Sequence, residues 1–285
     1  MSSYSDFGKE IVKSGVRKIR YLKGRTESAF LSDEKAWYCP CCESKVRKFK
    51  AGSFLKHPEI YDRRRFENTD QEVLCPVCLS FPRHRIMCHW IDKNMKMLQG
   101  RKILYFAPNP SVKGFLQRRG FAVTTADKFA KADLALDIMH IDLPDESQEM
   151  IICNHVMEYV EDYRIGLFEL RRILKKDGVM IISFPIDESL ETVYEDPSIT
   201  TPDERRRAYG ESENRRLFGR DSAELLEKAG FEVSRIEGGD CPNIIKPAVG
   251  PAGYDAGDLF LVQKVSDKKL YLHNDSCLYR SASLI

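Results

Sequence analysis

Two short segments, Cys39-Pro-Cys41-Cys42 and Cys75-Pro-Val77-Cys78, repeat the pattern Cys-Pro-x-Cys. Each pattern predicts a tight turn that directs two thiolates at one metal ion, and two such turns complete the tetrahedral sulfur shell that zinc favours. The expected zinc ligands are Cys39, Cys42, Cys75 and Cys78. Because four cysteines leave no open position for water, we assign this zinc a structural role and not a catalytic one.

The spacing of the cysteines leaves alternatives open. The gap between Cys42 and Cys75 holds 32 residues, which is long for a compact four-cysteine site, so an inserted hairpin or loop must lie there. His57 or His84 could replace one cysteine ligand, and the four thiols could also be a reduced, metal-free set. The remaining cysteines fit no such pattern and are expected to be ordinary thiols: Cys41, Cys88, Cys153, Cys241 and Cys277.

A second candidate site lies between Arg101 and Asp127. Here the sequence predicts a strand (102–106), a break at Ala-Pro-Asn-Pro, a helix (111–119) and a second strand (121–125). In such a unit a ligand lies over the carboxyl end of the first strand, and an acidic residue about 20 positions on accepts hydrogen bonds from ribose hydroxyls. Asp127 occupies that position. The turn lacks Gly-x-Gly-x-x-Gly, so a nucleoside without phosphates fits better than a dinucleotide.

Three further segments follow in a recognisable order: IICNHVMEYVED (151–162), ELRRILKKDGVMIISFP (169–185) and LLEKAGFEV (225–233). With the preceding unit they resemble class I S-adenosylmethionine-dependent methyltransferases over roughly residues 101–265. The resemblance implies an α/β fold with a Rossmann-like seven-stranded sheet, whose last strand (258–264) pairs antiparallel with residues 231–236.

The same resemblance implies S-adenosylmethionine as the cofactor. Residues 133–138 are expected to form the third strand and to bring Asp137 to the adenine amino group, although Asp137 could instead cap a turn. The cofactor-binding residues expected from the family pattern are Phe106, Ala107, Asp127, Asp137, Ile138 and Asn154.

The segment after the predicted strand 150–153 holds the candidate catalytic residues. His155 and Glu158 are the nearest groups that could take a proton from an oxygen or nitrogen nucleophile. The family's usual second histidine in this motif is Tyr159 here. The alternative is that His155 and Glu158 are structural. Methyl transfer from a sulfonium needs little acid or base help, because the leaving group is neutral and in-line positioning removes much of the barrier.

Residues 187–220 form a long charged insertion after the predicted fifth strand, and such insertions are more often lids or binding loops than spacers. In similar proteins this segment resembles Glu-Asp-Pro followed by Phe-Gly-x-x-Asp-His-x-Arg. Glu213-Asn214 replaces the acidic-His pair, so a base supplied by that histidine is absent here. The acceptor-binding residues expected are Tyr194, Glu195, Asp196 and Arg215.

An Arg-His-Arg segment, Arg83 to Arg85, follows the second cysteine pair and precedes a predicted helix (86–97). Some methyltransferases with a four-cysteine module carry such a segment, and many of them resemble small-molecule or sugar-modifying enzymes of bacterial glycan pathways. Arg83 and Arg85 could reach the cofactor's carboxylate or an acidic acceptor. A solvated pair that caps the next helix is the alternative.

Charge divides the chain near Gly100. Residues 1–100 hold 20 Lys and Arg against 12 Asp and Glu, a balance of +8, whereas the remaining 25 against 31 give −6. The first part includes a basic amphipathic helix (6–25), whose apolar residues from Phe7 to Leu22 recur every three or four positions. We expect this apolar stripe to pack on the zinc module; binding to a membrane surface or to RNA is less favoured. The expected organisation is a basic helix and linker (1–37), a zinc module with a connecting helix (38–100), a methyltransferase domain (101–265) and a C-terminal tail (266–285).

The 285 residues, 42% of them hydrophobic, suffice for one large or two smaller domains. No apolar run reaches the roughly 18 residues of a membrane span, and the first residues do not resemble a signal peptide, so the reducing cytoplasm is the expected location. The favoured function is methyl transfer to oxygen or nitrogen of a small-molecule or glycan-linked acceptor. One alternative is an RNA methyltransferase whose basic module holds phosphates, although no recognisable RNA-binding motif is present. The other is a non-catalytic binding protein in which the missing glycines mark a lost cofactor site.

Overall fold

The computed structural model describes residues 3–32, 36–50, 74–187, 189–236, 241 and 259–265. The predictions that concern His57, Cys277 and residues 266–285 therefore lie outside the described residues. Among the helices that are described, none combines the length and the apolar character that crossing a membrane requires.

A seven-stranded sheet with the order β5-β4-β3-β6-β7-β9-β8 forms the centre of the molecule. Neighbouring strands are parallel except β9, which runs antiparallel to both β7 and β8. This topology confirms the expected α/β class, the seven-stranded sheet and its antiparallel hairpin. The strands are β3 (Ile103–Phe106), β4 (Val123–Asp127), β5 (Leu134–Ala135), β6 (Gln148–Asn154), β7 (Leu174–Ser183), β8 (Phe231–Ile236) and β9 (Leu259–Lys264).

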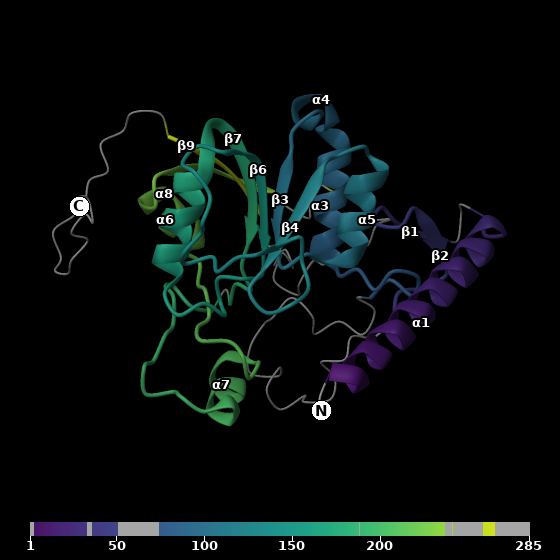
Figure 1. The fold of residues 1–285 in the computed structure, drawn as a ribbon, viewed down its shortest axis with the longest axis horizontal. Coiled ribbons are helices and arrows are strands. Elements are labelled where there is room, and N and C mark those ends of the chain that lie inside the picture. The colour runs from purple at the N-terminus through teal and green to yellow at the C-terminus, as the bar shows by residue number, and fades with distance from the viewer. Residues whose placement is uncertain are drawn as a thin grey trace, which may run out of the picture.

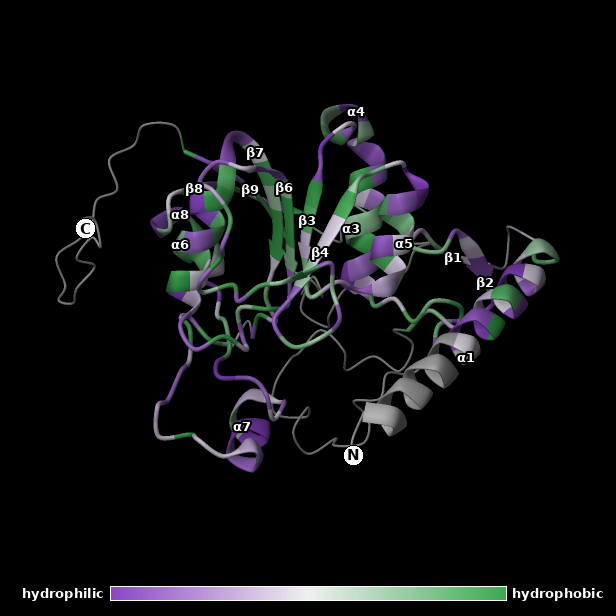
Figure 2. Cartoon of the chain, viewed as in Figure 1, coloured by the Kyte–Doolittle hydropathy of each residue, from purple (hydrophilic) through white to green (hydrophobic). Residues whose placement is uncertain are grey.

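Helices cover both faces of this sheet (Figure 1). One layer holds α3 (Pro82–Lys93) and α5 (Pro110–Arg118), with the short α4 (Met95–Leu98) at its end, and the other holds α6 (Tyr163–Ile173) and α8 (Ser222–Lys228). Within β3, Ile103 and Tyr105 belong to the core on the α3 and α5 side, whereas Leu104 and Phe106 belong to the core on the other side. Because helices cover both faces, the central strands are apolar over most of their length, as Figure 2 shows, with polar residues near the starts of β6 and β7.

The third parallel strand is shorter than predicted. Only Leu134–Ala135 pairs with β4, and the expected strand 133–138 is wrong in its second half. Asp137 instead turns the chain: its Oδ1 accepts from the Met139 N–H at 3.1 Å, and its backbone forms an isolated bridge with His140. The turn-capping alternative for Asp137 is thus present in the structure.

The N-terminal module is a small hairpin of β1 (Trp37–Cys39) and β2 (Ser44–Val46) with the cysteine turns around it. It lies beyond α5, between the sheet and helix α1 (Ser3–Ala29) (Figure 1). Buried side chains run continuously from the cysteines of this module through α3 to the sheet. Arg119, after α5, strengthens the contact, since its guanidinium pairs with Asp92 at 2.6 Å and with Glu43.

Helix α1 contacts the module through a different face than its apolar stripe predicts. Ile19 and Leu22 are 69% and 57% exposed, so the expectation that the stripe packs on the module is wrong at these positions. Tyr21 and Gly24 make the contact instead. A Cβ atom on Gly24 would lie 2.4 Å from Cγ2 of Val77, so the close approach of α1 requires glycine there. The earlier side chains of the stripe, including Phe7, Ile11, Val12 and Val16, are not described.

The insertion after β7 holds one helix, α7 (Pro202–Tyr209), which lies below the carboxyl edge of the sheet (Figure 1). Thr201 caps its first turn together with Glu204, and Gly210, at φ 88°, ends it. Isolated bridges join Tyr194 to Leu217 and Ile186 to Phe218, so both ends of the insertion are tied together.

Candidate active site and metal centre

A cavity of about 520 Å³ opens at the carboxyl ends of β3 and β4, between the sheet and the insertion. Six residues predicted from the sequence line it: Phe106, Ala107, Asp127, Asp137, Ile138 and Arg215. The sequence analysis missed several others, among them Lys128, Phe129, Met139, Tyr159, Glu211 and Glu213. The structure therefore brings most of the expected cofactor residues to one wall of this cavity and charged residues of the insertion to another.

The turn after β3 keeps a sharp conformation without glycine. Ala107 has φ 44°, in the left-handed region that glycine usually supplies, and its N–H donates to the Ala126 carbonyl at 2.9 Å. Asn109 then caps α5, because its Oδ1 accepts from the Ser111 N–H at 2.9 Å. Pro110 has no N–H, so the first turn of α5 has few donors left for a phosphate. This geometry suits a nucleoside without phosphates better than a dinucleotide.

Asp127 ends β4 with its carboxylate at the cavity. Oδ1 accepts from the backbone N–H groups of Phe129 and Ala130, at 2.8 and 2.7 Å. Oδ2 makes no hydrogen bond to any residue that the structure describes. One oxygen thus caps the turn, and the other can accept a hydrogen bond from a ligand hydroxyl.

Asp137, on the neighbouring turn, is already engaged. Its Oδ2 accepts from Nζ of Lys128 at 2.6 Å. Partial burial opposes ionisation, but the hydrogen bonds from Lys128 and the Met139 N–H hold the pKa of Asp137 below its ordinary value. The side chain is therefore an ionised, fixed acceptor at the edge of the cavity.

The loop after β6 holds the predicted catalytic pair. His155 has φ 54°, a strained value for a residue other than glycine, and its N–H donates to the Ser183 carbonyl at 3.1 Å. Nδ1 of His155 lies 3.5 Å from Oε1 of Glu158. Asn154, Glu158 and His155 are not part of the cavity lining, whereas Tyr159 of the same loop is.

Nδ2 of Asn154 and Oε2 of Glu158, both in this loop, are buried without a hydrogen bond to any described residue. Oδ1 of Asn154 accepts from the Ser183 hydroxyl, which fixes the amide. Buried polar atoms left in this state cost free energy unless a water or ligand reaches them, so they mark a place where a ligand group fits.

The pKa values around Glu158 are strongly shifted. Burial raises the pKa of Glu158 to about 8, although the nearby Arg83 guanidinium acts in the opposite direction. Burial, reinforced by Arg83 and His84, holds the pKa of His155 well below its ordinary value. Burial also raises the pKa of Glu211, and the positive charge of Arg83 again acts to lower it. Arg83, from the first turn of α3, is thus the cation that acts on both carboxyl groups.

Arg216, which the sequence analysis did not single out, fixes the insertion to this loop. Its side chain is fully buried and donates to the carbonyls of Met157, Val160 and Glu161 at 2.6 to 2.8 Å. It also makes two hydrogen bonds of 3.0 Å to the carboxylate of Glu195. Glu195 therefore binds the Arg216 guanidinium, and it is not one of the residues that line the cavity.

The other residues expected to bind the acceptor have structural contacts as well. Asp196 caps its own turn, because its Oδ1 accepts from the N–H of Ser198 at 2.9 Å. The ring of Tyr194 lies 5.8 Å from that of Tyr209. Of the four residues proposed from the insertion, only Arg215 lines the cavity.

A family model described as "Methyltransferase domain" matches residues 112–182, from α5 almost to the end of β7. Over residues 112–182 the chain carries a methyltransferase domain. A search of curated proteins finds no match.

Solved structures similar to the chain include 1,6-didemethyltoxoflavin-N1-methyltransferase from Burkholderia thailandensis, with bound 1,6-didemethyltoxoflavin and S-adenosylhomocysteine. Its identity is 16%, with 64% of this chain and 80% of that chain covered and a TM-score of 0.43. An S-adenosylmethionine-dependent methyltransferase from Archaeoglobus fulgidus has 14% identity and a TM-score of 0.43, with 64% of this chain and 94% of that chain covered. An S-adenosylmethionine-dependent methyltransferase from Mesorhizobium loti has 12% identity and a TM-score of 0.42, with 63% of this chain and 98% of that chain covered.

Beside the methyltransferase domain, the four predicted cysteines form one cluster. The sulfur atoms of Cys39, Cys42, Cys75 and Cys78 all lie within 4.8 Å of one another. The two turns have the same conformation: Glu43 and Leu79 follow them at φ 56° and 61°, and each N–H donates to the carbonyl of the turn's first cysteine. Cys41 is not part of the cluster.

The surroundings of the cluster suit a negatively charged metal centre. Arg85 is fully buried; burial lowers the pKa of Arg85, whereas negative charge on Cys39, Cys41, Cys75 and Cys78 acts to raise it. Its guanidinium donates to the Ser80 carbonyl at 3.1 Å and lies 4.1 Å from the centre of the Phe49 ring. The expectations that Arg85 binds the cofactor or is solvated are therefore wrong, because it is enclosed beside the thiols.

His84 is not a ligand of this cluster. Its Nδ1 accepts from the Phe81 N–H at 3.1 Å and so caps α3. Burial and the flanking arginines hold the pKa of His84 well below its ordinary value, which keeps the ring neutral and able to accept.

Proposed function

We propose that this methyltransferase domain transfers a methyl group from S-adenosylmethionine to oxygen or nitrogen of a small-molecule or glycan-linked acceptor. The observation that supports it best is the cavity at the carboxyl ends of β3 and β4. Asp127 borders this cavity from the sheet, and Glu211 and Arg215 border it from the insertion. Its volume of about 520 Å³ is typical of small-molecule sites.

The cofactor fits the sheet side of the cavity. Oδ2 of Asp127 would accept from ribose hydroxyls, and Phe106 and Ala107 would border the amino-acid part. Asp137 and Ile138 would border the adenine, and Phe129, which is 91% exposed, offers a ring face for stacking. Asn154, with its buried Nδ2, would hold the edge nearest the methyl group. When bound, S-adenosylmethionine supplies a methyl group on a positively charged sulfur.

The acceptor fits the insertion side. Glu211, Glu213, Arg205 and Arg215 give this wall charges of both signs, which suits a polar acceptor. We assign Arg215 to acceptor binding, and Tyr194, Glu195 and Asp196 to holding the shape of the insertion. The cavity volume of about 520 Å³ favours a small molecule or a chain end over a folded RNA.

Oxygen and nitrogen acceptors lose a proton when they are methylated. The pKa of Glu158, about 8, suits a base near neutral pH, but its side chain lies outside the cavity lining, so the acceptor would have to reach its buried Oε2. His155, 3.5 Å away, would orient the carboxyl group. Glu211 provides a second carboxyl group with a raised pKa at the cavity itself.

The four-cysteine cluster fits zinc. A tetrahedral site with Zn–S bonds of about 2.3 Å places its sulfur atoms about 3.8 Å apart. The Cys39–Cys78 and Cys42–Cys75 sulfur distances are 3.6 and 3.8 Å. Buried Arg85 offsets part of the charge that four thiolates and one zinc ion leave. Zinc would thus hold the module whose helix α3 delivers Arg83 to the active site.

Transfer of a labelled methyl group tests the proposal. The full chain is incubated with methyl-labelled S-adenosylmethionine and with separate pools of amino and hydroxy sugars, glycan oligosaccharides and total RNA. We expect label in a sugar or oligosaccharide pool, with S-adenosylhomocysteine as the co-product. Label in RNA alone would favour the RNA methyltransferase, and binding of cofactor with no transfer to any pool would favour a binding protein.

A further inference from the structure

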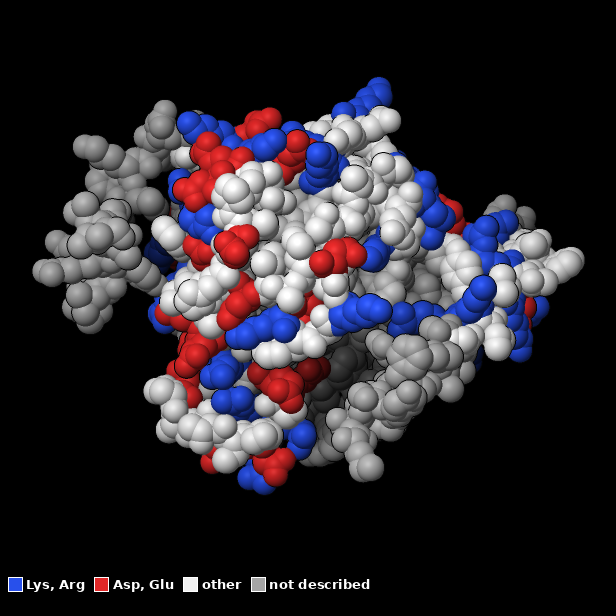
Figure 3. Space-filling model, in the orientation of Figure 1, with Lys and Arg blue, Asp and Glu red and all other residues white. Residues whose placement is uncertain are grey.

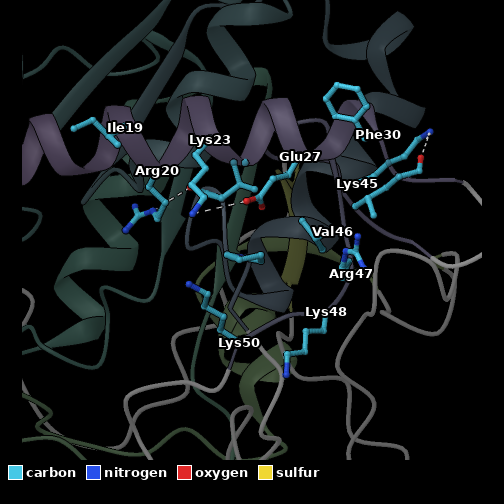
Figure 4. Close-up of a pocket in the computed structure, with 14 residues that line it drawn as sticks. Ile19, Arg20, Lys23, Glu27, Phe30, Lys45, Val46, Arg47, Lys48 and Lys50 are labelled. Atoms are coloured by element: carbon cyan, nitrogen blue, oxygen red, sulfur yellow. Dashed lines mark hydrogen bonds and ion pairs between the residues drawn. The ribbon is translucent and has the colours of Figure 1, made fainter.

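A groove of about 880 Å³ runs between α1 and the zinc module (Figure 4). Its floor includes Val46 and Val77, which are almost fully buried, and its apolar rim includes Ile19 of α1 and Phe30, just after α1. Ile19 is 69% and Phe30 85% exposed, so apolar groups here meet water. We call this feature the α1 groove.

Positive charge surrounds the α1 groove. Six of its lining residues are Lys or Arg, and among the described lining residues Glu27 is the one acid. The side chains of Arg47 and Lys48 have no hydrogen bond or ion pair with any described residue. The charge of Lys23 is partly offset by Glu27, whose Oε1 lies 3.9 Å from Nζ of Lys23. Figure 3 shows the same contrast: Lys and Arg gather over the α1 end of the molecule, whereas Asp and Glu gather around α6 and α7.

The α1 groove is separate from the methyl-transfer cavity. The two have no lining residue in common. In Figure 1 the C-terminal half of α1 lies at the right of the molecule, whereas α7, which contributes Arg205 to the cavity lining, lies at the lower left. A ligand in the groove would therefore not occupy the acceptor site, and the inference does not rest on the proposed function.

We propose that the α1 groove binds an acidic amphipathic helix of a partner protein. Such a helix places apolar side chains on the floor and acidic side chains against Arg47 and Lys48, so it satisfies both kinds of surface. From Ile19 to the end of α1 at Ala29 the groove follows the helix for about 15 Å, the length of about ten helical residues. That length holds two to three turns of a partner helix.

Other anionic partners match the α1 groove less well. A nucleic acid would pair its phosphates with the rim, but its bases need ring faces, and Phe30 is the one aromatic ring among the described lining residues. A flat lipid surface could meet Ile19 and Phe30 but could not reach Val46 and Val77 on the floor. The helix is the partner that fills a concave apolar floor between basic edges.

Fluorescence anisotropy tests this proposal with the full zinc-loaded chain. The probe is a labelled 18-residue peptide with leucine at helical spacing on one face and glutamate on the flanks. We expect saturable binding at one site per chain. A peptide with the leucines replaced by serine should bind at least tenfold more weakly, because the floor is then unfilled. Equal binding of both peptides would overturn the proposal.

Charge-reversal variants supply the matched control. Arg47→Glu with Lys48→Glu should weaken peptide binding at least tenfold, with zinc content and melting temperature unchanged. Lys93→Glu with Lys96→Glu changes the net charge equally on α3 and α4, away from the groove, and should leave binding within twofold. Equal losses in both double variants would show attraction to net charge alone. Tighter binding of a single-stranded RNA, or of vesicles containing anionic lipid, at the same residues would also contradict the proposal.

Discussion

Oε1 of Glu158 lies 3.5 Å from Nδ1 of His155 at the carboxyl end of β6, where the Glu158 side chain is almost fully buried and that of His155 is 14% exposed. Burial shifts the two pKa values in opposite directions, since it disfavours the charged form of each group. At neutral pH the carboxyl group therefore holds a proton and the imidazole is neutral. As the pH rises through about 8, Glu158 becomes a carboxylate that can accept a proton.

Glu158→Gln should lower kcat by roughly 100-fold, a typical contribution of a general base. Wild-type kcat should rise with pH and level off above about 8, whereas the Gln variant should show no such rise. Glu211→Gln is the control: because Glu211 raises the pKa of Glu158, its removal should move the rise to lower pH and not abolish it. A pH profile that Glu158→Gln leaves intact would exclude Glu158 as the base.

The same substitution predicts a change in stability with pH. The folded-state pKa of Glu158, about 8, is above the ordinary 4.5, so the folded protein binds this proton more tightly than the unfolded chain. Its stabilising contribution is complete below pH 4.5 and is lost as the pH rises to 8. Urea unfolding should show Glu158→Gln gaining stability relative to wild type between these two pH values. A constant difference would contradict the raised pKa.

Asp127→Asn separates cofactor binding from turn capping. Asparagine keeps an Oδ1 that can accept from Phe129 and Ala130, but places an NH₂ group where Oδ2 lies. Affinity for S-adenosylmethionine should fall at least tenfold, because charge-assisted hydrogen bonds are worth about 1.5 to 3 kcal/mol each. The melting temperature should stay near that of wild type. Asp127→Ala should lose both affinity and stability, and calorimetry with thermal melting distinguishes the two variants.

Metal analysis tests the cysteine cluster. We expect about one zinc ion per chain, since four thiolates at this geometry bind zinc tightly. Cys75→Ser should release the zinc and expose the module to proteolysis. Cys41→Ser, in the same turn as two proposed ligands, should retain it. Loss of zinc from both variants to the same degree would show that the ligands are assigned wrongly.

Two adjacent arginines of the insertion should behave differently. Arg216→Lys keeps a positive charge but cannot reach three carbonyls and Glu195 together, so the free energy of unfolding should drop by about 2 kcal/mol. Arg215→Lys should leave stability unchanged and raise the acceptor KM, because Arg215 lines the cavity. Denaturant titration and steady-state kinetics measure the two effects. If Arg215→Lys proves the destabilising change, the assignment of these residues is reversed.

Local patterns in the sequence predicted much of the fold. The strand–helix–strand unit ending at Asp127 follows from apolar spacing and from the breaks at Pro108 and Pro110, and its elements agree with the structure to within about two residues. The two cysteine turns follow from their shared spacing. These features depend on neighbouring residues, so one sequence suffices to predict them.

Features that depend on distant contacts were not predicted. Arg216 donates hydrogen bonds to backbone carbonyls about 55 to 60 positions earlier in the chain. Arg85 lies 4.1 Å from the centre of the Phe49 ring, 36 positions earlier in the chain. The exposed face of α1 could not be foreseen either, since the close approach at Gly24 depends on Val77, 53 positions later in the sequence. A pattern of neighbouring residues cannot predict contacts between residues so far apart in the sequence.

Calorimetric titration of S-adenosylmethionine into the full chain tests the central claim most directly. The account predicts saturable binding with one site per chain, with S-adenosylhomocysteine competing for the same site, because the cavity beside Asp127 fits one nucleoside. Absence of saturable binding up to millimolar cofactor, in zinc-loaded protein with a cooperative melting transition, would contradict the assignment of this cavity.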